Sequence, residues 1–214
     1  MNQIDTGLVK RLIREQFPEW AHLEVKPVKF SGHDNRTFQL GDKMSVRLPS
    51  DAAYTPQVEK ENKWLPILSK ELSLPISTPI AKGNPSEAYP WPWSINKWIE
   101  GETVTKQNVR DLSEFAAHLG SFLVELQSID ASKGPIAGAH NFYRGGLISV
   151  YDEEARDAIE NNKDVFDETV LKHLWDLALQ STWRRKQFGF MEMLHQGTYS
   201  LRMESFVPSL ILVF

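Results

Sequence analysis

The sequence predicts an α+β protein of two lobes, in which a β-rich first half precedes an α-rich second half. Between residues 23 and 101, apolar side chains recur mostly in short strand-like runs bounded by turn residues. Between residues 109 and 182 they recur at helical spacing instead. The two patterns meet near Glu100–Thr105, where we place the boundary between the lobes.

Composition and charge exclude several classes of protein. Of the 214 residues, 41% are hydrophobic and 24% are charged, which is near the globular average and argues against disorder. A formal charge of −4 favours neither nucleic acid nor an anionic membrane. No run approaches the ~18 apolar residues of a membrane span, and the N-terminus lacks the apolar core of a signal peptide. The absence of cysteine excludes disulfides and a thiolate nucleophile. We therefore expect a cytoplasmic protein with no nucleic acid and no membrane as partner.

One helix and an antiparallel meander are expected first. The apolar residues of 8–17 lie on one helical face, which Asp5 or Thr6 can cap and Pro18 ends. "LEVKPVKF" (23–30) alternates with period two and reads as a strand. "SGHDNR" is a turn, and "TFQL" and "MSVRLP" are two more strands joined by a Gly-Asp turn.

Further helices and strands follow in order. "TPQVEKENKWLPILSKEL" (55–72) has a helical apolar face, and Pro66 within it indicates a kink or an early end. "LPISTPIAKG" and "YPWPWSINKWIEG" read as strands, whose prolines belong at sheet edges or strand starts. We then expect a long helix over 109–126 and a looser, glycine-containing stretch over 128–150. Two last helices are expected in "VYDEEARDAIENN" and "DETVLKHLWDLALQSTW".

The turn at residues 31–36 is a candidate anion site. "FSGHDNRTFQL" reads as strand, short polar turn and strand, so its tip of small and polar residues exposes backbone N–H groups. A concavity of such groups can hold a phosphate. An ordinary hairpin loop is the alternative interpretation.

Arg47 is a candidate buried cation, since it lies inside the apolar strand "MSVRLP". A cation on a strand face needs an anionic partner, because burying it unpaired is costly. Glu61 on the next helix can supply the carboxylate, and the pair would form a fixed positive point beside the turn at 31–36. The alternative is an exposed arginine on an edge strand.

Trp98 and Ile99 lie where "WSINKWIEGET" runs from a strand into the lobe boundary. Their backbone groups could hydrogen-bond a flat heterocycle while aromatic and aliphatic side chains sandwich it. Ordinary aromatic packing is the alternative interpretation of the same residues.

These features occur in one order, and that order resembles the aminoglycoside phosphotransferase family, small-molecule kinases with a protein-kinase-like fold. "FSGHDNRTFQLGDKMSVRLP", "VEKENKWLPIL" and "YPWPWSINKWIEGET" are similar to members of that family, and the resemblance covers roughly residues 5–185. It implies an N-terminal ATP-binding lobe at residues 1–103 and an incomplete helical lobe at 104–187.

The resemblance also implies roles for the candidate residues. The turn would cover the nucleotide phosphates, and Arg47 would occupy the strand position that usually holds lysine, although a guanidinium fork does not replace an ammonium in every contact. Glu61 would be the partner of Arg47, and Trp98 and Ile99 would form the hinge that holds adenine. The implied nucleotide-binding residues are Ser31, Gly32, His33, Asn35, Arg47, Glu61, Trp98 and Ile99.

The chemistry of the family resides in a part of the helical lobe that this sequence does not match. Such kinases use ATP with Mg²⁺, a His-Gly-Asp loop whose Asp orients and deprotonates the acceptor hydroxyl, and a later Asn and Asp as metal ligands. None of these motifs occurs in the chain. We therefore assign no catalytic and no metal-binding residue here.

The segment 188–214 loses the regular pattern, and we expect it to be out-of-frame translation. "FMEM" must be encoded as TTY-ATG-GAR-ATG, where Y is a pyrimidine and R a purine. Read from the third base of the Phe190 codon, the triplets encode His or Tyr, then Gly, then Asp or Asn. The same shift permits the later Asn and an Asp-Phe-Gly. A sequencing error, a pseudogene or a real truncation could produce this tail, and a divergent terminus is the alternative.

By resemblance, the function is ATP-dependent phosphotransfer to a hydroxyl of a small molecule, such as an aminoglycoside or macrolide antibiotic. Its partners would be a nucleotide and this small-molecule hydroxyl acceptor. We predict that the chain itself is inactive because it lacks the catalytic loop. The alternative functions are a non-catalytic kinase-like module that binds a nucleotide or a protein, and no stable function at all.

Overall fold

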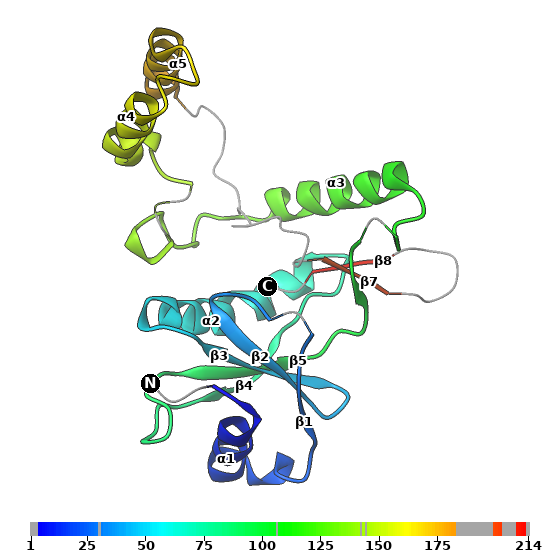
Figure 1. Ribbon diagram of the computed structural model, residues 1–214. Coiled ribbons are helices and arrows are strands. Elements are labelled where there is room, and N and C mark those ends of the chain that lie inside the picture. Colours follow the sequence, from blue (N-terminus) through cyan, green and yellow to red (C-terminus); the bar gives the residue numbers. More distant parts are fainter. Residues whose placement is uncertain are drawn as a thin grey trace. The chain divides into compact units, whose positions relative to one another are not determined.

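The computed structural model describes residues 4–29, 31–105, 107–141, 143 and 145–182, together with the backbone of 199–202 and 209–212. The chain divides into two compact units, Met1–Ile129 with Met191–Phe214, and Asp130–Phe190. The first unit contains the sheet that organises the candidate site (Figure 1).

Five antiparallel strands form the main sheet of the first unit, in the order β1-β2-β3-β5-β4. The meander predicted for the start of the chain is confirmed, and β3 lies between β2 and β5 at the centre. The strands are β1 (Val25–Pro27), β2 (Asn35–Leu40), β3 (Met44–Pro49), β4 (Pro79–Gly83) and β5 (Trp93–Lys97).

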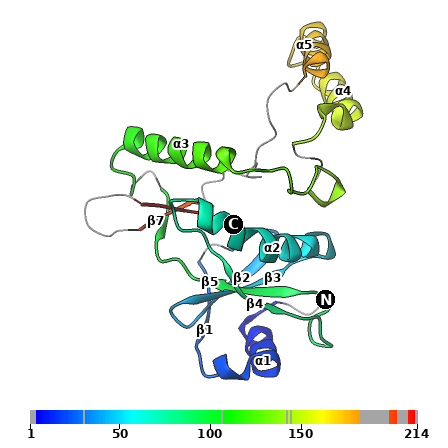
Figure 2. The same cartoon turned by 180° about the vertical axis from the view of Figure 1, so that it is seen from behind.

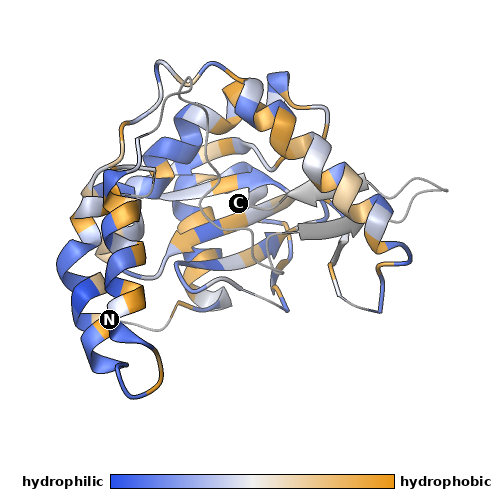
Figure 3. Cartoon of the chain, turned by 90° about the horizontal axis from the view of Figure 1, so that it is seen from above, coloured by the Kyte–Doolittle hydropathy of each residue, from blue (hydrophilic) through white to orange (hydrophobic). Residues whose placement is uncertain are grey.

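Helix α1 (Thr6–Gln16) covers one face of this sheet. Asp5 caps it, because its side-chain oxygen accepts a hydrogen bond from the Leu8 backbone N–H at 2.8 Å. Successive strand residues point to opposite faces, so every second strand residue packs under α1. This apolar face buries the following side chains: Leu8, Val9, Leu12, Ile13, Val25, Phe38, Leu40, Val46, Leu48, Tyr89, Trp93 and Ile95. Figure 3 shows the alternation of hydrophobic and hydrophilic residues along the strands.

Helix α2 (Thr55–Glu71) covers the opposite face of the sheet, as both ribbon views show (Figures 1 and 2). Of the two outcomes expected at Pro66, a kink or an early end, the early end is wrong, since α2 continues to Glu71. Leu65 and Leu68 flank the proline and pack into a second apolar cluster, which offsets the hydrogen bond that proline removes.

Helix α3 (Leu112–Ser128) packs against the end of α2 in that second cluster. Phe122 and Leu126 are its buried residues. The Glu125 carboxylate accepts hydrogen bonds from the backbone N–H of Ser73 at 2.9 Å and from its hydroxyl at 2.8 Å. These bonds, the backbone one first, hold the pKa of Glu125 below its usual value.

The second unit contains α4 (Asp152–Asn161) and α5 (Glu168–Gln180). Arg156 joins the two helices, because its guanidinium lies 2.9 Å from the Asp152 carboxylate and 2.8 Å from that of Asp176. The Trp175 indole also donates to Asp152 at 2.7 Å. Four short 3-10 helices complete the described helical structure of the chain: Pro18–Trp20, Ala52–Tyr54, Ala139–Asn141 and Ile148–Tyr151.

A second, three-stranded antiparallel sheet joins β6 (Glu102–Thr103), β7 (Tyr199–Arg202) and β8 (Ser209–Leu212). The out-of-frame hypothesis concerns residues 188–214, most of which, including "FMEM", lie outside the described residues. Among the described helices we find no candidate for a membrane span.

Tyr89 provides a test of the apolar face. Its hydroxyl donates to the Pro49 carbonyl at 2.6 Å, and burial raises the pKa of the Tyr89 phenol above its usual value. Tyr89→Phe should therefore cost about 1 kcal/mol of unfolding free energy, measured by urea denaturation near neutral pH.

The raised pKa of Tyr89 also gives a pH dependence. The stability it contributes is fully present below about pH 10, where the unfolded phenol is protonated, and is lost as the pH rises further. Tyr89→Phe should reduce the loss of unfolding free energy above about pH 10. Tyr54→Phe is the control, because that hydroxyl is exposed, and it should change neither measurement. An alkaline curve that Tyr89→Phe leaves unaltered would contradict the assignment.

Candidate functional site

The face of the sheet that α2 covers is polar. Directly opposed residues of antiparallel strands share a face, and the register places Ser45 opposite Asn96 and Arg47 opposite Ser94. Thr37 in turn lies opposite Arg47 on the neighbouring strand. The α2 face of the three central strands thus carries Thr37, Gln39, Ser45, Arg47, Ser94 and Asn96.

A buried ion pair occupies the middle of this polar face. The Arg47 guanidinium Nη1 lies 2.8 Å from Glu61 Oε2, and their side chains are only 11% and 7% exposed. Gln57, one turn earlier on α2, donates to the other Glu61 oxygen at 3.4 Å. The predicted pairing is confirmed, and the alternative of an exposed edge arginine is wrong because β3 is a central strand. The pair holds one guanidinium in a fixed place on the sheet.

The hairpin tip at residues 31–36 turns its carbonyl groups inward. Arg36 Nη1 donates to the carbonyls of Gly32 at 2.9 Å and His33 at 3.2 Å. The Ser50 hydroxyl donates to the carbonyls of His33 at 2.7 Å and Asp34 at 3.1 Å. The Ser50 backbone N–H adds a third bond, to the Asp34 carbonyl at 2.8 Å. The peptide oxygens of the tip are therefore engaged with the protein.

The backbone N–H groups of the tip remain available to a ligand. In the described part of the chain, those of Gly32, His33 and Asp34 have no hydrogen-bond acceptor. The Ser31 hydroxyl closes the base of the turn, since it donates to the Asn35 carbonyl at 3.0 Å and accepts from the Thr37 N–H at 3.0 Å. Successive free N–H groups form a concavity that suits an anion.

Trp98 and Ile99 differ in what their backbones can offer. The Trp98 N–H donates to the Lys43 carbonyl at 2.8 Å, so it is already used. Within the described residues, the Ile99 N–H has no acceptor and remains available for a ligand. The Trp98 N–H continues the pairing beyond the end of β5, so of the two residues only Ile99 has a backbone N–H without an acceptor among those described. That backbone groups of this pair bind a heterocycle stays a prediction.

These groups lie in a row along β3. At the end of β3 near the hairpin tip, Pro49 lies opposite Asn35. Arg47 lies two residues before Pro49 in the sequence, and Ser45, two residues before Arg47, lies opposite Asn96. At about 3.3 Å per residue, the row is roughly 13 Å long with the cation at its middle. An elongated ligand with an anionic end and a flat end matches this spacing.

The structure thus places the sequence-predicted residues along one face of a single sheet, with the hairpin tip at one end of β3, Trp98 and Ile99 beyond the other end, and Glu61 on the helix that covers this face. Sequence reasoning missed Ser50, which fixes the tip, and Asn96, which shares the face of Arg47. It also missed Tyr54, whose hydroxyl lies 3.3 Å from His33 Nδ1. The signal for Asn96 was present, because Ser94 and Asn96 alternate with apolar residues in "WSINK" as Arg47 does in "MSVRLP".

Among the residues that the structure describes, no three His, Cys, Asp or Glu side chains are grouped so that they could hold a metal ion. The Glu61 carboxylate accepts hydrogen bonds from Arg47 and Gln57.

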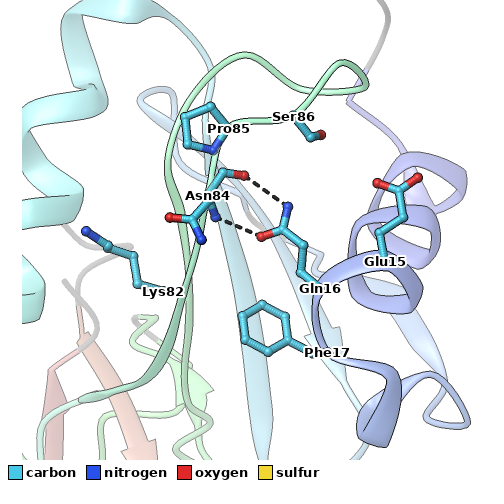
Figure 4. A pocket seen from close by; sticks show the side chains of 7 residues that line it. All are labelled: Glu15, Gln16, Phe17, Lys82, Asn84, Pro85 and Ser86. Carbon is cyan, nitrogen blue, oxygen red and sulfur yellow. Dashed lines mark hydrogen bonds between the residues drawn. The ribbon is translucent and has the colours of Figure 1, made fainter.

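A cavity of about 450 Å³ lies elsewhere, between the end of α1 and the segment that follows β4 (Figure 4). Its amide groups pair with each other, since Gln16 Nε2 donates to the Asn84 carbonyl at 3.0 Å and the Asn84 N–H donates to Gln16 Oε1 at 2.8 Å. Lys82 lies 2.7 Å from Glu59. These pairings occupy the amide groups and the ammonium group of the cavity, whereas the buried Ser86 hydroxyl, which also lines it, has no partner in the described part of the chain. The lining residues are Glu15, Gln16, Phe17, Lys82, Asn84, Pro85 and Ser86.

Comparisons with known proteins identify a family and a fold for this chain. The sequence matches the family model described as "Phosphotransferase enzyme family" over residues 24–190. A GDP complex of a mutant aminoglycoside 2'-phosphotransferase-IIIa is similar in structure, with a TM-score of 0.75, 17% identity and coverage of 98% of this chain and 71% of that one. A GDP and kanamycin complex of APH(2")-IIIa has a TM-score of 0.71 and 15% identity, with coverage of 96% of this chain and 71% of that one. A macrolide 2'-phosphotransferase from Brachybacterium faecium has a TM-score of 0.62 and 15% identity, with coverage of 99% of this chain and 72% of that one.

At such low identities the similarity concerns the fold, and it confirms the predicted α+β, kinase-like fold class. The comparison with curated proteins finds no match.

The buried pair can be tested by its energetics. Glu61→Ala should cost about 3–5 kcal/mol of unfolding free energy, because it leaves the Arg47 charge buried and unpaired. The double replacement Arg47→Met with Glu61→Leu should recover most of that loss.

Glu59→Ala is the matched control for urea denaturation. Glu59 also lies on α2 and pairs with Lys82, but both side chains are exposed, so the cost should stay below about 1 kcal/mol. Equal costs for the two glutamates would show that the Arg47–Glu61 pair is not buried in solution.

Proposed function

Because this chain belongs to the phosphotransferase enzyme family, we propose that its first unit binds a nucleoside triphosphate on the polar face of the sheet. The observation that carries the proposal is the Arg47–Glu61 pair, which fixes a buried cation about two residues from a hairpin tip of free N–H groups. A polyphosphate supplies the negative charge that both elements are arranged to meet.

Each sequence-predicted residue has a role in this proposal. The N–H groups at Gly32 and His33 bind the terminal phosphates, while Ser31 and Asn35 close the turn that presents them. Arg47 contacts the phosphate nearest the sheet, and Glu61 holds Arg47 in place. The free Ile99 N–H hydrogen-bonds the base, while Trp98 lines its plane.

The acceptor we propose is a hydroxyl group of an aminoglycoside or macrolide. Structures similar to this chain include a GDP and kanamycin complex, a ternary complex with streptomycin and ATP, and macrolide 2'-phosphotransferases. In phosphoryl transfer of this kind the terminal phosphoryl group passes to the hydroxyl, and catalysis rests on positioning and charge neutralisation. When bound, Mg²⁺ would neutralise phosphate charge.

For the polypeptide as sequenced, we propose binding without turnover. The sequence contains no His-Gly-Asp motif that could supply the base of the family reaction. What the chain retains is the nucleotide-binding half of the chemistry.

Nucleotide binding is testable by thermal unfolding with ADP. A hundredfold excess over Kd should stabilise the chain by about 2.7 kcal/mol and raise Tm by several degrees. The variant Arg47→Met with Glu61→Leu should fold but lose the shift, because it removes the cation without leaving a buried charge. The exposed pair Lys82→Met with Glu59→Leu is the matched control and should keep it. An ADP shift that survives in the first double variant would place the nucleotide elsewhere.

Turnover is testable separately. Incubation with ATP, Mg²⁺ and a panel of aminoglycosides and macrolides should give no phosphorylated product above background by mass spectrometry. A product that depends on the chain and is lost with the Arg47→Met, Glu61→Leu variant would refute the proposal of binding without turnover.

A further inference from the structure

Asn96 is a buried side chain whose amide has no hydrogen-bond partner. The residue is only 1% exposed, and neither Oδ1 nor Nδ2 finds a partner in the described part of the molecule. Burying both ends of an amide unpaired costs several times what a hydrogen bond contributes. Native proteins keep such groups mainly where a ligand or a water completes them.

The position of Asn96 connects this unpaired amide to the nucleotide site. It lies on the α2 face of β5, opposite Ser45 and thus about 7 Å along the sheet from Arg47. Three residues later along the chain comes Ile99, whose N–H is free among the described residues. Asn96 therefore lies at the end of the row where we propose that the flat base of the nucleotide binds, away from the hairpin tip proposed to bind the phosphates.

We propose that Asn96 reads the substituent at position 6 of a purine base, which rests on the proposed nucleotide site. An amide offers an acceptor in Oδ1 and a donor in Nδ2 on one planar group. Adenine presents a 6-amino donor and guanine a 6-oxo acceptor. Rotating the amide by half a turn exchanges the two, so the same side chain completes either base. The site then accepts both adenine and guanine nucleotides.

Other purine contacts do not give this tolerance. A backbone N–H such as that of Ile99 is only a donor and keeps one polarity whatever base arrives. The other buried side-chain atoms without partners in the described residues are Ser86 Oγ and Trp93 Nε1. Trp93 belongs to the α1 face, so it does not contribute here.

The experiment measures binding of three diphosphates to the full chain by calorimetry: ADP, GDP and purine riboside 5'-diphosphate, which has hydrogen at position 6. ADP and GDP should bind within about fivefold of each other, and the purine analogue about tenfold more weakly, because it forfeits one hydrogen bond. In Asn96→Leu, ADP and GDP should fall to the affinity of the analogue, whose own binding stays unchanged.

Stability supplies a second readout. Asn96→Leu should not lower Tm in the absence of nucleotide, because the amide has no protein partner to lose. Ser77→Ala is the control, since it also removes a buried polar group beside β5, and its hydroxyl donates to the Lys97 carbonyl at 2.9 Å. It should lower Tm and leave the preference among the three ligands unchanged.

The outcomes separate this inference from the function beneath it. If the wild type binds ADP but treats all three ligands alike, or if Asn96→Leu keeps their ranking, the reading of position 6 is wrong while the nucleotide site stands. If the wild type binds none of the three, both fail. If Asn96→Leu does not fold, the affinities of the wild type for the three diphosphates remain the test, and equal affinities contradict the proposal.

Discussion

The ion pair between Arg47 and Glu61 is the constraint on which the rest of the first unit depends. The Arg47 side chain in the central strand β3 is only 11% exposed, so its charge needs a carboxylate nearby. The carboxylate comes from α2, which fixes where that helix crosses the sheet. Once α2 is placed, its second half contributes Leu65 to the cluster with α3. The Arg47–Glu61 pair therefore links the sheet to α2, and α2 in turn packs against α3.

The same requirement divides the sheet into two faces of different chemistry. Under α1 the alternate residues are apolar and closely packed, which stabilises the unit through burial. Under α2 the other alternate residues are polar, and several are buried although they contribute little to packing. The large apolar cluster thus lies on the α1 face, whereas the α2 face carries the buried ion pair and the buried polar side chains.

The sequence predicts most of this arrangement where local pattern and local chemistry agree. Period-two alternation in "MSVRLP" and "WSINK" identifies two strands, and the cost of burying Arg47 identifies Glu61 as its partner. The inward carbonyls of the hairpin tip depend on Ser50, which lies beyond β3, so they follow from register and not from the turn itself. The continuation of α2 through Pro66 also needed tertiary packing, since propensity alone argues against it. The β6-β7-β8 sheet could not be predicted, because its pairing joins segments about 100 residues apart.

The hairpin tip at Gly32, His33 and Asp34 is held mainly through its peptide oxygens. The His33 ring adds longer contacts, at 3.4 Å to the Asp34 carboxylate and 3.3 Å to the Tyr54 hydroxyl. The surface that the tip presents is accordingly main chain, which every amino acid other than proline provides. Replacements at those three positions can accumulate over evolution with the anchoring chemistry intact, whereas Arg36 and Ser50, which do the holding, tolerate far less. In this loop the side chains that hold the backbone in place belong to Arg36 and Ser50 and not to the three residues that carry the N–H groups of the tip.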